Sequence, residues 1–134
     1  MDKKIQEKLY LYQFLKKQEE ALLNQAVLIE QEIENSLITE NVVKELENQK
    51  GKDILVSLGK DCFLRTEVKD DKILLNLGAE VLAKKSVADA KKILEERRKN
   101  LTKEKEGLNQ KLEKIAEQIK KVEPEIQKIL TQKS

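Results

Sequence analysis

The stretch that decides the fold runs from Gly51 to Ser86 and reads GKDILVSLGKDCFLRTEVKDDKILLNLGAEVLAKKS. It holds three of the chain's four glycines. Turn-type residues divide it into four short apolar pieces, namely Ile54–Leu58, Cys62–Val68, Ile73–Leu77 and Val81–Lys85. Pieces this short suit β-strands, because a helix needs roughly 10 residues or more. Short links favour antiparallel neighbours, so the stretch predicts two consecutive β-hairpins.

The segment before the hairpins, residues 2–50, contains no Gly or Pro and is rich in good helix formers. A heptad frame predicts that one stripe of this helix faces a partner helix. One set of stripe positions is Ile5, Tyr12, Glu19, Ala26 and Ile33, and the other is Lys8, Leu15, Leu22, Ile29 and Ser36. The polar residues between 35 and 41 leave open a bend or a restart of the helix.

The segment after the hairpins, residues 87–132, has a cleaner heptad. Ser86 followed by Asp89 predicts a capped helix start. The stripe positions are Leu94, Leu101, Leu108, Ile115, Val122 and Ile129, with companions Lys91, Arg98, Lys105, Leu112, Ile119 and Ile126. A stripe this long indicates a coiled coil. Gly107 costs about 1 kcal/mol against Ala, and Pro124 is expected to kink or fray the last turns.

Together these segments predict an α+β fold in which a long antiparallel two-helix coiled coil is joined by two β-hairpins. We expect a single domain over residues 1–134, with an N-terminal coiled-coil helix at 2–50, hairpins at 51–86 and a C-terminal coiled-coil helix at 87–132. Each helix would be roughly 65 Å long. That geometry places Ile5–Leu15 beside Val122–Leu130 at one tip of the coiled coil.

The composition argues against several classes of protein. Charged residues make up 39% and aromatic residues 3% of the chain, a mixture typical of coiled coils. A net charge of +2 gives little attraction to nucleic acid, and no apolar run approaches the ~20 residues of a membrane span. With no His and one Cys, a catalytic centre, a cofactor or a metal site is not expected. We therefore predict a cytoplasmic protein that is not an enzyme.

Three further features have ordinary interpretations. Cys62 lies in an alternating strand and is expected to be an inert, half-buried thiol. Asp70 and Asp71 form a turn. The basic run at 97–99 has acidic neighbours and no interleaved aromatic residues, so a solvated helix face is expected there.

The tip of the coiled coil carries the first candidate binding surface. Tyr10, Tyr12 and Phe14 are three of the four aromatic residues and lie within five positions. One partner helix covers one stripe, so part of this apolar surface is expected to remain open to a polypeptide client. The alternative is that the helix ends or another subunit bury it. The predicted client-binding residues are Ile5, Leu9, Leu11, Tyr12, Phe14, Ile126, Ile129 and Leu130.

The hairpins carry the second candidate surface, because their apolar residues fall on both faces. A ribbon of this kind is unstable alone in water, and its edges leave backbone groups unpaired. Strands from several chains could satisfy both needs in a shared sheet or barrel; the alternative is a monomer whose hairpins fold onto its own helices. The predicted subunit-interface residues are Ile54, Leu55, Val56, Leu58, Phe63, Leu64, Val68, Ile73, Leu74, Leu75, Leu77 and Val81.

The order helix, two hairpins, helix resembles the α-type subunits of the prefoldin family. The resemblance lies in Ile54–Gly59 (ILVSLG), Phe63–Val68, Lys72–Gly78 (KILLNLG) and Ser86–Arg97 (SVADAKKILEER), and it extends as architecture over the whole chain. Two hairpins instead of one point to the α type. Ser57 stands where the family commonly has proline, and Lys60-Asp61-Cys62 replaces a Gly-rich turn.

This resemblance implies a function and partners. Two α-type and four β-type subunits would form a hexamer whose hairpins build a double β-barrel, with the coiled coils hanging from it. The hexamer would act as an ATP-independent holdase that binds non-native polypeptides at the coiled-coil tips and delivers them to a group II chaperonin. The alternatives are a structural coiled-coil scaffold or a filament-forming γ-type prefoldin.

Overall fold

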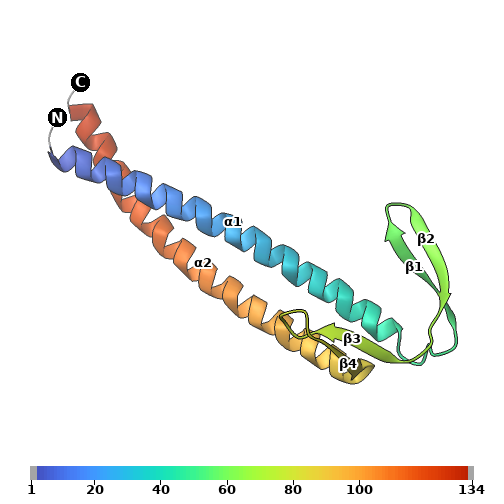
Figure 1. Ribbon diagram of the computed structural model, residues 1–134. Helices are drawn as coiled ribbons and strands as arrows, with labels where there is room; N and C mark the ends of the chain where they lie inside the picture. The colour runs from blue at the N-terminus through green and yellow to red at the C-terminus, as the bar shows by residue number, and fades with distance from the viewer. Residues whose placement is uncertain (1–2, 133–134) are drawn as a thin grey trace. The chain divides into compact units, whose positions relative to one another are not determined.

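A computed structural model describes residues 3–132 and contains the predicted order of elements (Figure 1). The elements are α1 (Lys3–Glu45), β1 (Asp53–Gly59), β2 (Cys62–Glu67), β3 (Lys72–Asn76), β4 (Leu82–Ser86) and α2 (Val87–Gln132). β1 pairs antiparallel with β2, and β3 pairs antiparallel with β4, so both predicted hairpins are confirmed. The predicted limits at residues 1, 2 and 134 lie outside the described residues.

The first helix differs from the prediction at its C-terminal end. α1 runs without interruption through residues 35–41, so neither the bend nor the restart is present. It ends at Glu45 and not near residue 50, and Asn48 has a left-handed φ of 61°. A residue in that conformation cannot continue a right-handed helix, and Asn tolerates it better than most residues do.

The chain divides into two compact units, one formed by residues 1–32 and 101–134 and the other by residues 33–100. In the first unit α1 and α2 run antiparallel, because residues early in α1 meet residues late in α2. Lys8 Nζ lies 2.9 Å from Glu125 Oε2, and Lys105 forms an ion pair with Glu30. The buried cluster of this unit is made of Leu15, Ile115, Ile119, Val122 and Ile126.

The heptad stripes predicted from the sequence are confirmed with one exception. Every predicted stripe position of α1 is buried or half-buried, and so is every one in α2 except Lys91, which is exposed. Ala90 takes the buried position beside Lys91 and is 0% exposed. The second hairpin packs at this level, and a small residue lets the backbones approach closely.

The predicted fraying of α2 at Pro124 is absent. The helix continues to Gln132, and Pro124 itself is exposed. Val122 and Ile126, on either side of the proline, are buried in the cluster that joins the two helices. Burial of these neighbours stabilises the helix around the proline.

The second unit contains both hairpins, and only the β3–β4 hairpin is anchored to the helices. Val43, Leu75, Val87, Ala90 and Leu94 form its buried cluster, against which Ile73 and Ile93 also pack. Arg97 Nη2 donates a hydrogen bond of 2.8 Å to the carbonyl oxygen of Asn76, at the end of β3. The Asp89 amide donates to Ser86 Oγ at 3.1 Å, which confirms the predicted helix cap.

A buried ion pair links α1 and α2 in this unit. Glu40 is 9% exposed and accepts a hydrogen bond of 2.8 Å from Arg98 Nε. Glu40 continues the α1 stripe and Arg98 belongs to the α2 stripe, so the pair lies in the seam. A carboxylate removed from water and left without its cation costs far more than the pair itself contributes.

Replacing Arg98 with Ala should therefore lower the free energy of unfolding by about 3 kcal/mol. Urea denaturation followed by circular dichroism measures the change. Lys99→Ala is the matched control, because Lys99 makes only an exposed i,i+4 pair with Glu95 at 3.8 Å and should cost less than about 0.5 kcal/mol. Equal effects of the two substitutions would contradict a structural role for the Glu40–Arg98 pair.

The turn of the β3–β4 hairpin holds two residues in an unfavourable backbone conformation. Ala79 and Glu80 have left-handed φ values of 48° and 62°, and the Val81 amide donates to the Gly78 carbonyl at 2.9 Å. This is the geometry of a type I′ turn, which prefers Asn-Gly at its two central positions. Residues with a Cβ atom pay roughly 1–2 kcal/mol each in that conformation, and Asn and Gly pay less.

The double substitution Ala79→Asn with Glu80→Gly should raise the free energy of unfolding by about 1 kcal/mol, because it relieves this strain. Chemical denaturation gives the value. Ala79→Val should act in the opposite direction, since a β-branched residue fits a left-handed φ poorly. A neutral or destabilising Asn-Gly variant would show that the turn has a different geometry.

Candidate functional site

The β1–β2 hairpin exposes apolar side chains on both of its faces. Cross-strand pairing places Ile54 and Thr66, and Val56 and Leu64, on one face, while Leu55 and Arg65, and Ser57 and Phe63, share the other. No residue of β1 or β2 is buried, and Phe63 is 63% exposed. Ile54 is half-buried and lines a hollow with Val42 and Leu46, whereas the other large apolar side chains of the two strands are exposed.

The same hairpin has open edges. The described sheets are two-stranded, so each strand has one neighbour and one side whose backbone groups point away from the pair. The ladder continues a little beyond the strands, with Gly51 donating to the Val68 carbonyl at 2.7 Å and Val68 to the Lys52 carbonyl at 3.0 Å. An open edge beside exposed apolar groups is a template for pairing with another strand.

One face of the β3–β4 hairpin packs inside the chain, and the other face is exposed. Ile73 and Leu75 pack against the helices of their own chain, so for these two residues the predicted subunit interface requires correction. The reason is that a hairpin lying on a helix pair must bury one face there. Leu74 and Leu82 lie on the opposite face and are exposed.

The structure places the other predicted interface residues at or near the surface. Ile54 and Val68 are half-buried. The exposed members are Leu55, Val56, Leu58, Phe63, Leu64, Leu74, Leu77 and Val81. Leu82 is also exposed and lies on the same face of the hairpin as Leu74, but the predicted set does not include it. The sequence could have indicated it, because side chains alternate along a strand and Leu82 directly follows Val81.

The predicted client-binding residues separate into covered and open groups. Ile5 and Ile126 are buried, and Leu9, Tyr12 and Ile129 are half-buried between the helices, so this conformation covers them. The open members are Leu11, Phe14 and Leu130. Tyr10 is 74% exposed, was left out of the predicted set, and lies one helical turn from Phe14.

Two minor predictions also require correction. Arg97 and Lys99 are exposed, as predicted, although Arg97 also donates to the Asn76 carbonyl. Arg98 is half-buried and pairs with Glu40, so it does not belong to a solvated face. Cys62 is exposed and not half-buried.

Within residues 3–132, no group of three or more His, Cys, Asp or Glu side chains is arranged to hold a metal ion. None of the described helices is long and apolar enough to span a membrane.

Comparison with known proteins agrees with this geometry. A family model described as "Prefoldin subunit" matches residues 15–132. The chain belongs to the prefoldin family. Prefoldins are subunits of a molecular chaperone, and the two hairpins place this prefoldin with the α type.

Individual relatives support the same assignment. The curated protein "Prefoldin subunit alpha" of Methanosphaera stadtmanae is 32% identical over 72 residues, which are 54% of this chain and 52% of the relative. The match thus spans about half the length of that relative. A cryo-EM structure of filamentous PFD from Methanocaldococcus jannaschii has a TM-score of 0.73 and 22% identity, and covers 85% of this chain and 96% of that chain. At that identity the likeness is one of fold.

Charges placed on the two faces of the β1–β2 hairpin should prevent this prefoldin from assembling. We expect Val56→Glu with Phe63→Glu to lower the mass measured by light scattering to that of a single chain while helical circular dichroism stays unchanged. The control is Leu23→Glu with Leu28→Glu, which changes exposed apolar residues of α1 in the same way. If the hairpin variant keeps the mass of the wild type, the hairpin is not the assembly surface.

Proposed function

We propose that this prefoldin subunit forms part of an ATP-independent holdase. In this proposal two copies assemble with four β-type subunits through their hairpins. The assembly binds non-native polypeptides at the coiled-coil tips and passes them to a group II chaperonin in the cytoplasm. The observation that carries the proposal is the β1–β2 hairpin, which exposes apolar residues on both faces and has no buried residue in either strand.

The hairpins support the assembly half of the proposal. Exposed Leu55 and Phe63 lie on one face of the first hairpin, and Val56 and Leu64 lie on the other. A two-stranded ribbon is marginal in water by itself, whereas three or more strands with a covered face are stable. Pairing with strands of other subunits supplies both the missing strands and the cover. The identity of those subunits as β-type chains follows from the family resemblance.

The helix ends support the binding half of the proposal. Tyr10, Leu11, Phe14 and Leu130 are exposed beside a seam that is already filled. Each of these side chains offers a shallow contact, and none lies in a deep pocket. Several such arms on one assembly would bind an unfolded chain through many weak contacts, since the first contact raises the effective concentration for the next. Release then needs no nucleotide.

A filament-forming prefoldin is the second candidate function. It is favoured by the fold likeness to filamentous PFD from Methanocaldococcus jannaschii. The first strand also departs from the common α-type pattern at Ser57, and its turn departs at Lys60-Asp61-Cys62. The two candidates differ in what the purified chain does alone, because a filament former assembles into long fibres without a second kind of subunit.

The tip assignment can be tested with Tyr10→Gln and Phe14→Gln combined. Both side chains are exposed, so the free energy of unfolding should change by less than about 0.5 kcal/mol. Suppression of the aggregation of a denatured client protein, measured by light scattering on the assembled chaperone, should fall several-fold.

The matched control for the tip is Leu23→Gln with Leu28→Gln, which removes exposed apolar surface elsewhere on α1. It should leave suppression close to that of the wild type. Suppression that survives in the tip variant, or that falls equally in the control, would refute the assignment of client binding to the helix ends.

A further inference from the structure

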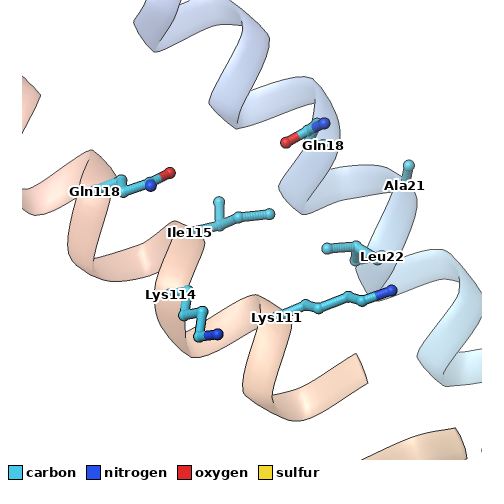
Figure 2. A pocket seen from close by; sticks show the side chains of 7 residues that line it. All are labelled: Gln18, Ala21, Leu22, Lys111, Lys114, Ile115 and Gln118. Carbon is cyan, nitrogen blue, oxygen red and sulfur yellow. The ribbon is translucent and has the colours of Figure 1, made fainter. Parts of the chain in front are cut away.

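A groove runs between α1 and α2 in the unit formed by residues 1–32 and 101–134. One section has a volume of about 460 Å³ and is lined by Gln18, Ala21, Leu22, Lys111, Lys114, Ile115 and Gln118. Figure 2 shows Leu22 and Ile115 extending toward each other from α1 and α2, with Gln18 and Ala21 along one wall and Lys111 reaching from the other. The next section, about 330 Å³, shares Lys111 and adds Gln25, Ile29, Glu104, Gly107 and Leu108.

The two walls of this groove differ in charge. The α1 segment from Ala21 to Ile29 (ALLNQAVLI) contains no charged residue, although 39% of the chain is charged. On the α2 wall, Lys111 and Lys114 are exposed and lie one turn apart. Among the ion pairs of residues 3–132, neither lysine has a carboxylate partner. Two uncompensated cations thus border an apolar floor.

Gly107 lines the second section of the groove. A Cβ atom there would meet nothing within 4 Å, so the helix backbone is open at this point and a side chain could be added without a clash.

We propose that this groove binds an extended segment of a non-native polypeptide that carries acidic residues among apolar ones. The half-buried Leu22 and the aliphatic stems of Lys111 and Lys114 contact the apolar side chains, and the two ammonium groups pair with the carboxylates. The amides of Gln18, Gln25 and Gln118 can each donate to and accept from the unpaired backbone of such a segment. This inference rests on the proposed function and adds a class of preferred client sequence, at a place separate from the helix ends.

The dimensions of the groove fit a short extended segment. Its α1 wall runs from Gln18 to Ile29, about 17 Å along the helix axis. An extended chain covers that distance in roughly five residues. Glu104 lies at one end of the groove, so the carboxylates of the segment should lie toward Lys111 and Lys114 and away from that end.

The test uses the assembled full-length chaperone and three fluorescent peptides of about eight residues. Each alternates Leu and Ser and carries two Glu, two Gln or two Lys at the same positions, and fluorescence anisotropy gives Kd. We expect the Glu peptide to bind about tenfold more tightly than the Lys peptide, with the difference shrinking at high salt. Lys111→Glu with Lys114→Glu should reverse this preference.

Two further variants separate the groove from general electrostatics. Lys120→Glu with Lys121→Glu changes the net charge equally at exposed positions outside the groove, and should keep the preference of the wild type. Gly107→Leu should weaken binding of all three peptides at least fivefold, because its side chain enters the groove. Since the space above Gly107 is open, this variant should still fold, which circular dichroism verifies.

The proposal is overturned if charge reversal at 111 and 114 leaves the peptide preference unchanged or if the 120/121 control reverses it too. It is also overturned if the 111/114 variant lowers the mass of the assembly, because the groove is then a contact between subunits. None of these results bears on client binding at Tyr10 and Phe14, which the suppression of aggregation tests separately.

Discussion

The structure depends on one constraint: the β1–β2 hairpin cannot satisfy its own backbone or cover its own apolar side chains. Leu55, Val56, Phe63 and Leu64 point to solvent on both faces, and each strand has a single hydrogen-bonded neighbour. Water can solvate the backbone edges, but exposing large apolar groups to water is unfavourable. Contact with strands of other chains would pair the open edges and cover the apolar side chains.

The two hairpins meet this constraint in different ways. The second is held by Leu75 in a buried cluster and by the hydrogen bond from Arg97 to Asn76. It therefore has a fixed position relative to the helix ends of its unit, with one face still open. The first has no buried residue in either strand. An anchored hairpin beside an unanchored one gives an assembly surface with one defined part and one adaptable part.

Much of the fold could be predicted from the sequence, because it rests on periodicity. The heptads of both helices identify the seam almost residue by residue, and the turn residues around Gly59 and Gly78 locate the hairpins. Periodicity does not predict which helices and strands contact one another. The burial of Ala90 in place of Lys91, and the use of Ile73 and Leu75 inside the chain, follow from where the second hairpin lies.

The candidate surfaces were less accessible to sequence reasoning for the same reason. A run of apolar residues near a helix end does not say which of them the partner helix covers, so Ile5 and Ile126 were grouped with the open residues and Tyr10 was not. The charged seam residues also looked like interruptions. In the structure Arg98 and Lys105 have acidic partners on α1, namely Glu40 and Glu30. The charged residues in the part of the seam nearer the hairpins therefore form ion pairs between the helices.

Hydrogen exchange of the backbone amides tests the central constraint most directly. The measurement compares residues 53–67 with residues 72–86, in the assembly and in the chain diluted until it is a single species. We expect slow exchange in both hairpins of the assembly and, in the single chain, rapid exchange in the first hairpin with protection retained in the second. Equal protection of both hairpins in the single chain would contradict it.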